Sequence, residues 1–71
     1  MTDAVIRVQL NGELTACPPH CPLLEFLAQQ QLEPRLIAIE YNGEILHRQF
    51  WATTRLAAGD RLEIVTIVGG G

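Results

Sequence analysis

Apolar and polar residues alternate near the start of the chain. Every second residue from Ile6 to Leu10 is apolar, and a period of two residues predicts a strand with one buried face over residues 5–10. Asn11 and Gly12 follow directly. This dipeptide is typical of two-residue hairpin turns, in which both central residues need a positive φ. We therefore expect the chain to turn back on itself at this point.

Residues 13–17 are predicted to form the returning strand of this hairpin, with Leu14 and Ala16 facing the core. Pro18 and Pro19 end that strand, because proline has no N–H to donate to a neighbouring strand. The sequence thus predicts one hairpin that closes before the prolines.

A helix is predicted over residues 23–32, where good helix formers follow a proline that suits a first helical turn. Leu23, Leu24, Leu27 and Ala28 recur at helical spacing. We expect them to form the stripe that the helix buries against the sheet.

The second half of the chain repeats the pattern of strand and turn. Residues 36–41 are predicted as a strand with Ile37, Ile39 and Tyr41 on one face, and an Asn-Gly pair follows them. A short fourth strand over residues 45–48 is expected to complete this second hairpin.

A helical turn and a last strand are predicted to end the domain. The turn covers residues 49–52, with Phe50 or Trp51 over an edge of the core, and the strand covers residues 61–68. Two hairpins around one helix, followed by a final strand, predict an α+β fold of the β-grasp or ubiquitin-like type. We expect a mixed four- to five-stranded sheet with one main helix packed across it, and the first and last strands parallel at its centre.

Composition narrows the classes of protein that this chain can represent. Its 71 residues suffice for one domain and leave little room for an enclosed active site, which favours a carrier or binding module over an enzyme. Five arginines, no lysine and eight acidic residues give a formal net charge of −3, which argues against nucleic acid as a partner. We find no signal-peptide pattern and no apolar run of membrane-spanning length, so we expect a cytoplasmic protein with no membrane partner.

Three consecutive glycines, Gly69 to Gly71, are the most specific feature of the sequence. We predict a domain over residues 1–68 and a flexible tail over residues 69–71, which would reach about 10 Å when extended. Glycines without Cβ atoms can thread a narrow channel, so the tail can deliver the carboxylate of Gly71 to another protein.

That carboxylate would need activation before it could react. Adenylation by ATP is the usual route, and a sulfur nucleophile can then displace AMP to leave a thiocarboxylate. The chain has no phosphate-binding G-x-x-x-x-G-K-[ST] motif. We therefore expect no bound cofactor and no catalytic residue here, with ATP used by an activating enzyme.

Several short motifs recur in a fixed order along the second half of the chain. They are Asn42-Gly43-Glu44, Arg48, Trp51, Gly59-Asp60, Leu62-Glu63-Ile64-Val65 and Gly70-Gly71. In these motifs the chain resembles the ThiS family of sulfur carriers in thiamine thiazole synthesis. Residues 36–71 resemble the family closely, and residues 5–32 resemble it in layout only.

The resemblance implies three partners. A ThiF-type enzyme would adenylate Gly71, a desulfurase system would supply sulfur that derives from cysteine, and a ThiG-type thiazole synthase would take the sulfur. Small subunits of molybdopterin synthase share the fold and the diglycine and remain the alternative. A ubiquitin-like binding module or modifier without sulfur chemistry is the third interpretation, although a protein without lysine cannot form lysine-linked chains on itself.

Cys17, His20 and Cys21 lie where this chain departs from the family, whose members often have a glycine-containing loop there. Zinc takes four ligands and only three are near, so we predict no metal site. Cys21 could lie at a helix N-terminus, where thiol pKa values fall, which would suit a redox or persulfide role. Two small, partly buried thiols are the favoured interpretation.

The last strand also suggests a docking site. If Leu62 and Ile64 face the core, Val65 and Ile67 face outward. Exposed apolar residues beside a reactive tail are typical of a surface that binds a partner.

Overall fold

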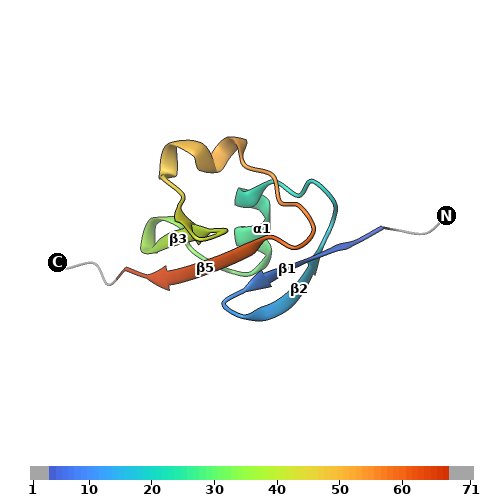
Figure 1. The fold of residues 1–71 in the computed structure, drawn as a ribbon. Helices are drawn as coiled ribbons and strands as arrows, with labels where there is room; N and C mark the ends of the chain where they lie inside the picture. Colours follow the sequence, from blue (N-terminus) through green and yellow to red (C-terminus); the bar gives the residue numbers. More distant parts are fainter. Residues whose placement is uncertain (1–3, 68–71) are drawn as a thin grey trace.

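Two hairpins, one α-helix and a final strand make up residues 4–67, the part of the chain that the computed structural model describes. Figure 1 shows these elements in place. In chain order they are β1 (Ile6–Leu10), β2 (Glu13–Cys17), α1 (Leu23–Gln29), the 3-10 helix η1 (Pro34–Leu36), β3 (Ile37–Tyr41), β4 (Glu44–Ile45), the 3-10 helix η2 (Arg48–Thr53) and β5 (Arg61–Thr66).

The strands form one five-stranded mixed sheet in the order β2-β1-β5-β3-β4. The hairpin pairs β1–β2 and β3–β4 are antiparallel, and β5 fills the space between them. It runs parallel to β1 and antiparallel to β3, as Figure 1 shows. This arrangement confirms the predicted β-grasp fold, with β1 and β5 as parallel neighbours.

Both predicted Asn-Gly turns are present. Asn11 and Gly12 have φ values of 51° and 86°, and Asn42 and Gly43 have φ values of 51° and 89°. Positive φ at both central residues defines the type I′ turn, whose twist matches that of the flanking strands. Each turn therefore fixes the register of its hairpin.

The two turn asparagines also hold β5. The Ile64 N–H donates to Asn11 Oδ1 at 2.7 Å, and the Arg61 N–H donates to Asn42 Oδ1 at 2.8 Å. Asn11 lies in the turn of the first hairpin and Asn42 in the turn of the second. These two bonds therefore attach the central strand to both halves of the sheet.

The prediction that Leu14 and Ala16 of β2 face the core is wrong. Leu14 is 69% exposed and Ala16 is also exposed, whereas Cys17 is buried. The two-residue turn places Leu14 opposite Gln9, and residues opposite each other in a sheet share a face. Since Gln9 faces outward on β1, Leu14 must face outward too.

The helix is shorter than predicted, and its buried stripe agrees with the prediction only in part: Leu23 and Leu27 are buried as expected. It ends at Gln29, because Gln31 takes a left-handed conformation with φ of 60°. Phe26 is fully buried, whereas Leu24 and Ala28, which were expected inside, are exposed. The buried side of α1 is thus centred on Phe26.

The second hairpin is followed by a longer 3-10 helix than expected. Strand β4 ends at Ile45 rather than at residue 48, and η2 covers Arg48–Thr53. Trp51 is only 4% exposed and its Nε1–H donates to the Leu46 carbonyl at 2.8 Å, while Phe50 is 48% exposed. Of the two aromatic candidates, Trp51 covers the core.

Arg48 fastens η2 to the segment before β3. Its guanidinium donates to the carbonyl oxygens of Pro34 at 2.7 Å and Ile37 at 3.2 Å. Its Cζ atom also lies 4.8 Å from the centroid of the Trp51 ring, in a cation–π contact. Arg48 therefore holds the aromatic cover in position.

The core lies between one face of the sheet and the layer formed by α1 and η2. The other face of the sheet is not covered by any helix of residues 4–67. Within that range no helix is long and apolar enough to cross a bilayer. The buried apolar residues are Val8, Cys17, Cys21, Leu23, Phe26, Leu27, Ile37, Ile39, Trp51, Leu56, Leu62 and Ile64.

Candidate functional site

The predicted chemical group lies outside the described residues. Gly71, with Gly69 and Gly70 before it, falls beyond residue 67, as does the end of the predicted strand over residues 61–68. The structure does describe how the chain leaves the sheet. Strand β5 ends at Thr66, and the Ile67 N–H still donates to the Leu36 carbonyl at 2.5 Å. The backbone is thus held by the fold as far as Ile67.

The uncovered face of the sheet presents the outward residues of β5. Leu62 and Ile64 are buried, as predicted, so their neighbours in the strand face away from the core. Val65 is 60% exposed and Ile67 is 46% exposed. The expectation that these two side chains are exposed is confirmed, and their role in docking stays a prediction.

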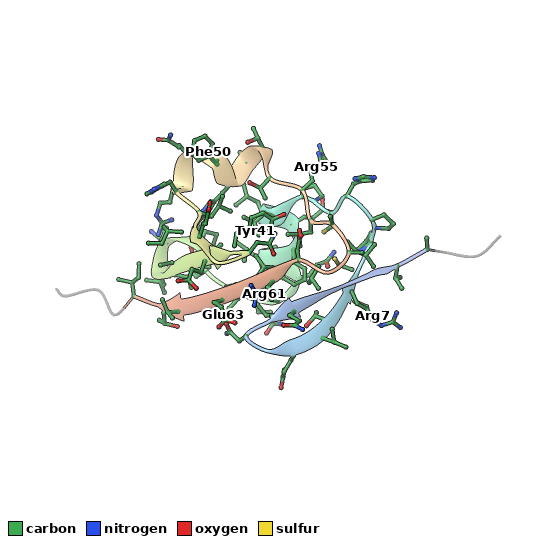
Figure 2. The ribbon with its side chains drawn as sticks, in the orientation of Figure 1. Arg7, Tyr41, Phe50, Arg55, Arg61 and Glu63 are labelled. Carbon is green, nitrogen blue, oxygen red and sulfur yellow. The ribbon has the colours of Figure 1, made fainter. Side chains whose placement is uncertain are left out.

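Neighbouring strands extend this surface into a shallow open depression of about 610 Å³. Ile45, which is 69% exposed, contributes to it from β4 because it pairs with the outward-facing Glu40 of β3. Figure 2 shows Arg61 and Glu63 along β5, while Phe50 lies on η2 at the opposite side of the view. We call the following lining residues the β5 patch: Ala38, Ile39, Glu40, Ile45, Arg61, Glu63 and Val65.

The β5 patch contains charged as well as apolar side chains. Glu40 and Glu63 lie directly opposite each other on β3 and β5, an arrangement that is unfavourable for two like charges. Arg61 is two residues from Glu63 on the same strand, yet among the side chains of residues 4–67 no ion pair involves any of these three. The patch therefore combines apolar contact area with carboxylates that a positively charged partner group would relieve.

Sequence reasoning placed only Val65 in this depression. Ile45 and Glu40 were missed because they enter through the pairing of β3 with β4 and β5, which the order of elements along the chain does not state. The Asn-Gly turn at residues 42–43 was the available signal, since a two-residue turn fixes Glu40 opposite Ile45.

A polar cluster positions the turn that leads into β5. The Tyr41 hydroxyl and the Ala57 N–H both donate to Asp60 Oδ2, and Asn42 Nδ2 donates to Asp60 Oδ1 at 3.2 Å. Burial, together with the hydrogen bond to the Asp60 carboxylate and its negative charge, raises the pKa of Tyr41 to about 12. These contacts are partly buried and hold the turn that orients β5.

The two cysteines lie in the core, and Cys21 also adjoins the N-terminus of α1, where it was expected. Cys17 ends β2, and Cys21 precedes Pro22, the residue that caps α1. Both thiols are free and almost fully buried, at 3% and 2% exposure. Burial raises the pKa of both, so the expected lowering at Cys21 is wrong. Among the described residues no group of His, Cys, Asp and Glu side chains gathers as a metal site.

A five-stranded mixed sheet with one helix and an open face at its C-terminal strand defines a ubiquitin-like β-grasp protein. The model of the ThiS family matches residues 8–71. The chain therefore belongs to the ThiS family, whose members are small sulfur carriers.

Individual relatives agree with this assignment. The chain is 38% identical to the sulfur carrier protein ThiS of Bacillus subtilis over 65 residues, which cover 90% of this chain and 98% of the relative. It is 30% identical over 66 residues to a thiazole synthase of Paramagnetospirillum magneticum, covering 93% of this chain and 20% of that protein. In structure it resembles the thiamine biosynthesis protein ThiS from Geobacter metallireducens, with a TM-score of 0.78 and 25% sequence identity. The match covers 93% of this chain and 100% of the Geobacter chain.

Proposed function

We propose that this sulfur carrier acts through the carboxylate of Gly71 and supplies sulfur for thiazole formation in thiamine biosynthesis. A partner enzyme transfers AMP from ATP to the carboxylate and releases pyrophosphate. A sulfur nucleophile then attacks the carbonyl carbon and AMP leaves, so that a C–S bond replaces the activated C–O bond. The observation that carries this proposal is the family match, which runs through residue 71 and includes all three tail glycines.

The thiazole branch is favoured over other sulfur acceptors by one relative. In the protein from Paramagnetospirillum magneticum, a segment similar to almost the whole of this chain makes up a fifth of a thiazole synthase. Such a union places a ThiS-like domain and a synthase in permanent proximity. The corresponding partner proposed here is a ThiG-type thiazole synthase, and the earlier partners are a ThiF-type adenylating enzyme and a desulfurase system.

The β5 patch, together with Ile67, is the docking surface for these partners. Val65 and Ile67 directly precede the tail, so a partner bound there holds the start of the tail in place. From Ile67, the four remaining residues span at most about 14 Å when extended. The reactive carbon therefore has to fall within that distance of the docking surface.

Mass spectrometry tests the chemistry directly. The protein is incubated with ATP, a sulfur donor and the adenylating enzyme, and the C-terminal peptide is weighed. We expect one oxygen of Gly71 to be replaced by sulfur, and deletion of Gly71 to abolish the change. A peptide that keeps its free carboxylate under these conditions, or that is found joined to lysines of other proteins, contradicts the proposal.

A pair of substitutions tests the docking surface. Val65→Asp combined with Ile67→Asp should weaken the complex with the adenylating enzyme and slow sulfur loading at least tenfold, because two charges replace apolar contacts. Phe50→Asp is the matched control, since Phe50 is 48% exposed but lies on η2. Equal rates of sulfur loading in the double variant and the control would contradict the docking role of Val65 and Ile67.

A further inference from the structure

Charged side chains follow a definite order along the uncovered face of the sheet. Arg7 and Gln9 face outward on β1, because the residues that alternate with them pack in or against the core. Gln9 pairs with Arg61 of β5, so Arg7 lies on the same face as Arg61, two residues back along the neighbouring strand. Figure 2 shows Arg7, Arg61 and Glu63 following one another toward the C-terminal end of β5. The basic end of the face is therefore the end where β5 begins.

Two carboxylates come next along the face. Glu40 and Glu63 are directly opposite each other on β3 and β5, and two residues further along β3 the Asn42 N–H donates to the Arg61 carbonyl at 2.8 Å. Because hydrogen-bonded pairs recur every second residue between antiparallel strands, Glu40 and Glu63 form such a pair, with Cα atoms about 5.5 Å apart. One guanidinium group can reach two carboxylates at that separation.

The end of the face nearest the tail is apolar. Val65 is exposed and pairs with Ala38, and the exposed Ile67 is the last described residue of the chain. Ile45 extends the apolar area beside Glu40. Toward the tail, the face is therefore basic, then acidic, then apolar.

The charges of this face are not neutralised by one another. All four charged residues are exposed, and none of them has an ion pair within residues 4–67. Two carboxylates opposite each other are unfavourable in the free protein, and a partner with the opposite order of charges would relieve them. Complementary charges also fix the orientation of a partner, since a partner turned by half a rotation would bring like charges together.

We propose that the adenylating enzyme docks on this face in a single orientation, an inference that rests on the proposed function. Its surface places a basic side chain against Glu40 and Glu63 and an acidic side chain against Arg7 and Arg61. Arginine suits the first position, because its planar guanidinium can donate to both carboxylates. Since the described chain leaves this face at Ile67, a fixed orientation determines which part of the enzyme Gly71 can reach.

A charge swap tests this orientation without changing the net charge. Arg61→Glu combined with Glu63→Arg reverses the order of signs along β5. We expect the Kd for the adenylating enzyme, measured by calorimetry without ATP, to rise by about tenfold or more. Glu33→Arg combined with Arg35→Glu is the matched control, because this exposed ion pair has the same spacing but lies outside the β5 patch. The control should change the Kd by less than about twofold.

A neutral variant separates loss of attraction from reversal of charge. Arg61→Gln combined with Glu63→Gln should give a Kd between those of the wild type and the swapped variant, with a weaker dependence on salt. The swap should not lower the unfolding midpoint, because the new arginine faces Glu40. If the swapped variant fails to fold, the neutral variant decides by its Kd and its salt dependence.

Two results would overturn the orientation. They are a swapped variant that binds as tightly as the wild type, and a neutral variant that loses as much affinity as the swapped one. Sulfur loading of the wild type is measured in parallel. Normal loading with either result contradicts the orientation alone, whereas tight binding of the wild type without loading contradicts the proposed function.

Discussion

At the scale of single residues, Tyr41 couples the second hairpin to the turn before β5. It is the one tyrosine of the chain, and its hydroxyl donates to the carboxylate of Asp60, which is only 8% exposed. Burial disfavours the charged phenolate, and ionisation would also replace this hydrogen bond with repulsion between two anions. Together these effects raise the pKa of Tyr41 to about 12 from the usual value near 10.

The raised pKa of Tyr41 predicts a loss of stability at high pH. Because the folded pKa lies above the unfolded one, the contribution of the protonated hydroxyl is complete below about pH 10 and is lost as pH rises through about 12. Titration of the phenolate absorbance of the folded protein should give a midpoint near 12, and a midpoint near 10 would contradict the contact with Asp60.

Tyr41→Phe isolates the same hydrogen bond. Removal of the hydroxyl should lower the free energy of unfolding by about 1–2 kcal/mol at neutral pH, since Asp60 keeps its bonds from Ala57 and Asn42. In guanidinium unfolding, the difference between wild type and variant should shrink between pH 10 and pH 12. A difference that does not change with pH would show that the hydroxyl is not the titrating contact.

At the scale of elements, the two type I′ turns define strand register and also hold the central strand. Asn11 needs a positive φ and also accepts the Ile64 N–H. These two contributions can be separated, because glycine keeps the backbone conformation and loses the side-chain oxygen.

Two substitutions of Asn11 should therefore lower the free energy of unfolding by different amounts. Asn11→Gly is expected to lower the free energy of unfolding by about 1–2 kcal/mol, the value of a hydrogen bond whose donor becomes unpaired. Asn11→Ala should cost about 1 kcal/mol more, because alanine at a positive φ is strained. Chemical denaturation measures both, and equal losses would contradict the separation.

The helix offers a second test at this scale. Phe26→Ala should lower the free energy of unfolding by about 3–5 kcal/mol, because it empties a fully buried site. Leu24→Ala is the matched control and should cost less than about 1 kcal/mol, since Leu24 is 41% exposed. Comparable losses in both variants would mean that α1 packs on the face that the sequence pattern first favoured.

These elements also show how far sequence reasoning reaches. Alternation and the Asn-Gly pairs predicted all five strands and both hairpins, because both signals are local. The facing of Leu14 was misjudged by weighing its hydrophobicity above the register that its own turn imposes. The end of α1 had no local signal, since a glutamine, Gln31, takes the left-handed position that glycine usually occupies.

The candidate site divides in the same way. The outward direction of Val65 and Ile67 followed from parity along one strand and is confirmed. The acidic pair of Glu40 and Glu63 depends on which strands become neighbours, and the burial of Cys17 and Cys21 in one core depends on the geometry of the loop between them. The alternation of inward and outward residues along one strand reveals neither the neighbours of that strand nor the geometry of a loop.

At the scale of the whole molecule, the core and the proposed reactive group lie in separate parts of the chain. Within residues 4–67, every buried apolar residue lies between Val8 and Ile64. Removal of residues 69–71 should therefore leave the free energy of unfolding within about 0.5 kcal/mol of the full chain, while sulfur loading is lost. A clear drop in the unfolding midpoint would show that the tail belongs to the folded domain and would contradict the boundary at residue 68.

The central position of β5 has a consequence for synthesis. The ribosome makes this strand after every other element of residues 4–67, yet β1 and β3 are joined only through it. A nascent chain that stops short of residue 61 cannot close its sheet, and unpaired strand edges expose it to proteolysis. A folded sheet therefore reports that translation has passed β5, so quality control that removes unfolded chains also removes carriers truncated before that strand is complete.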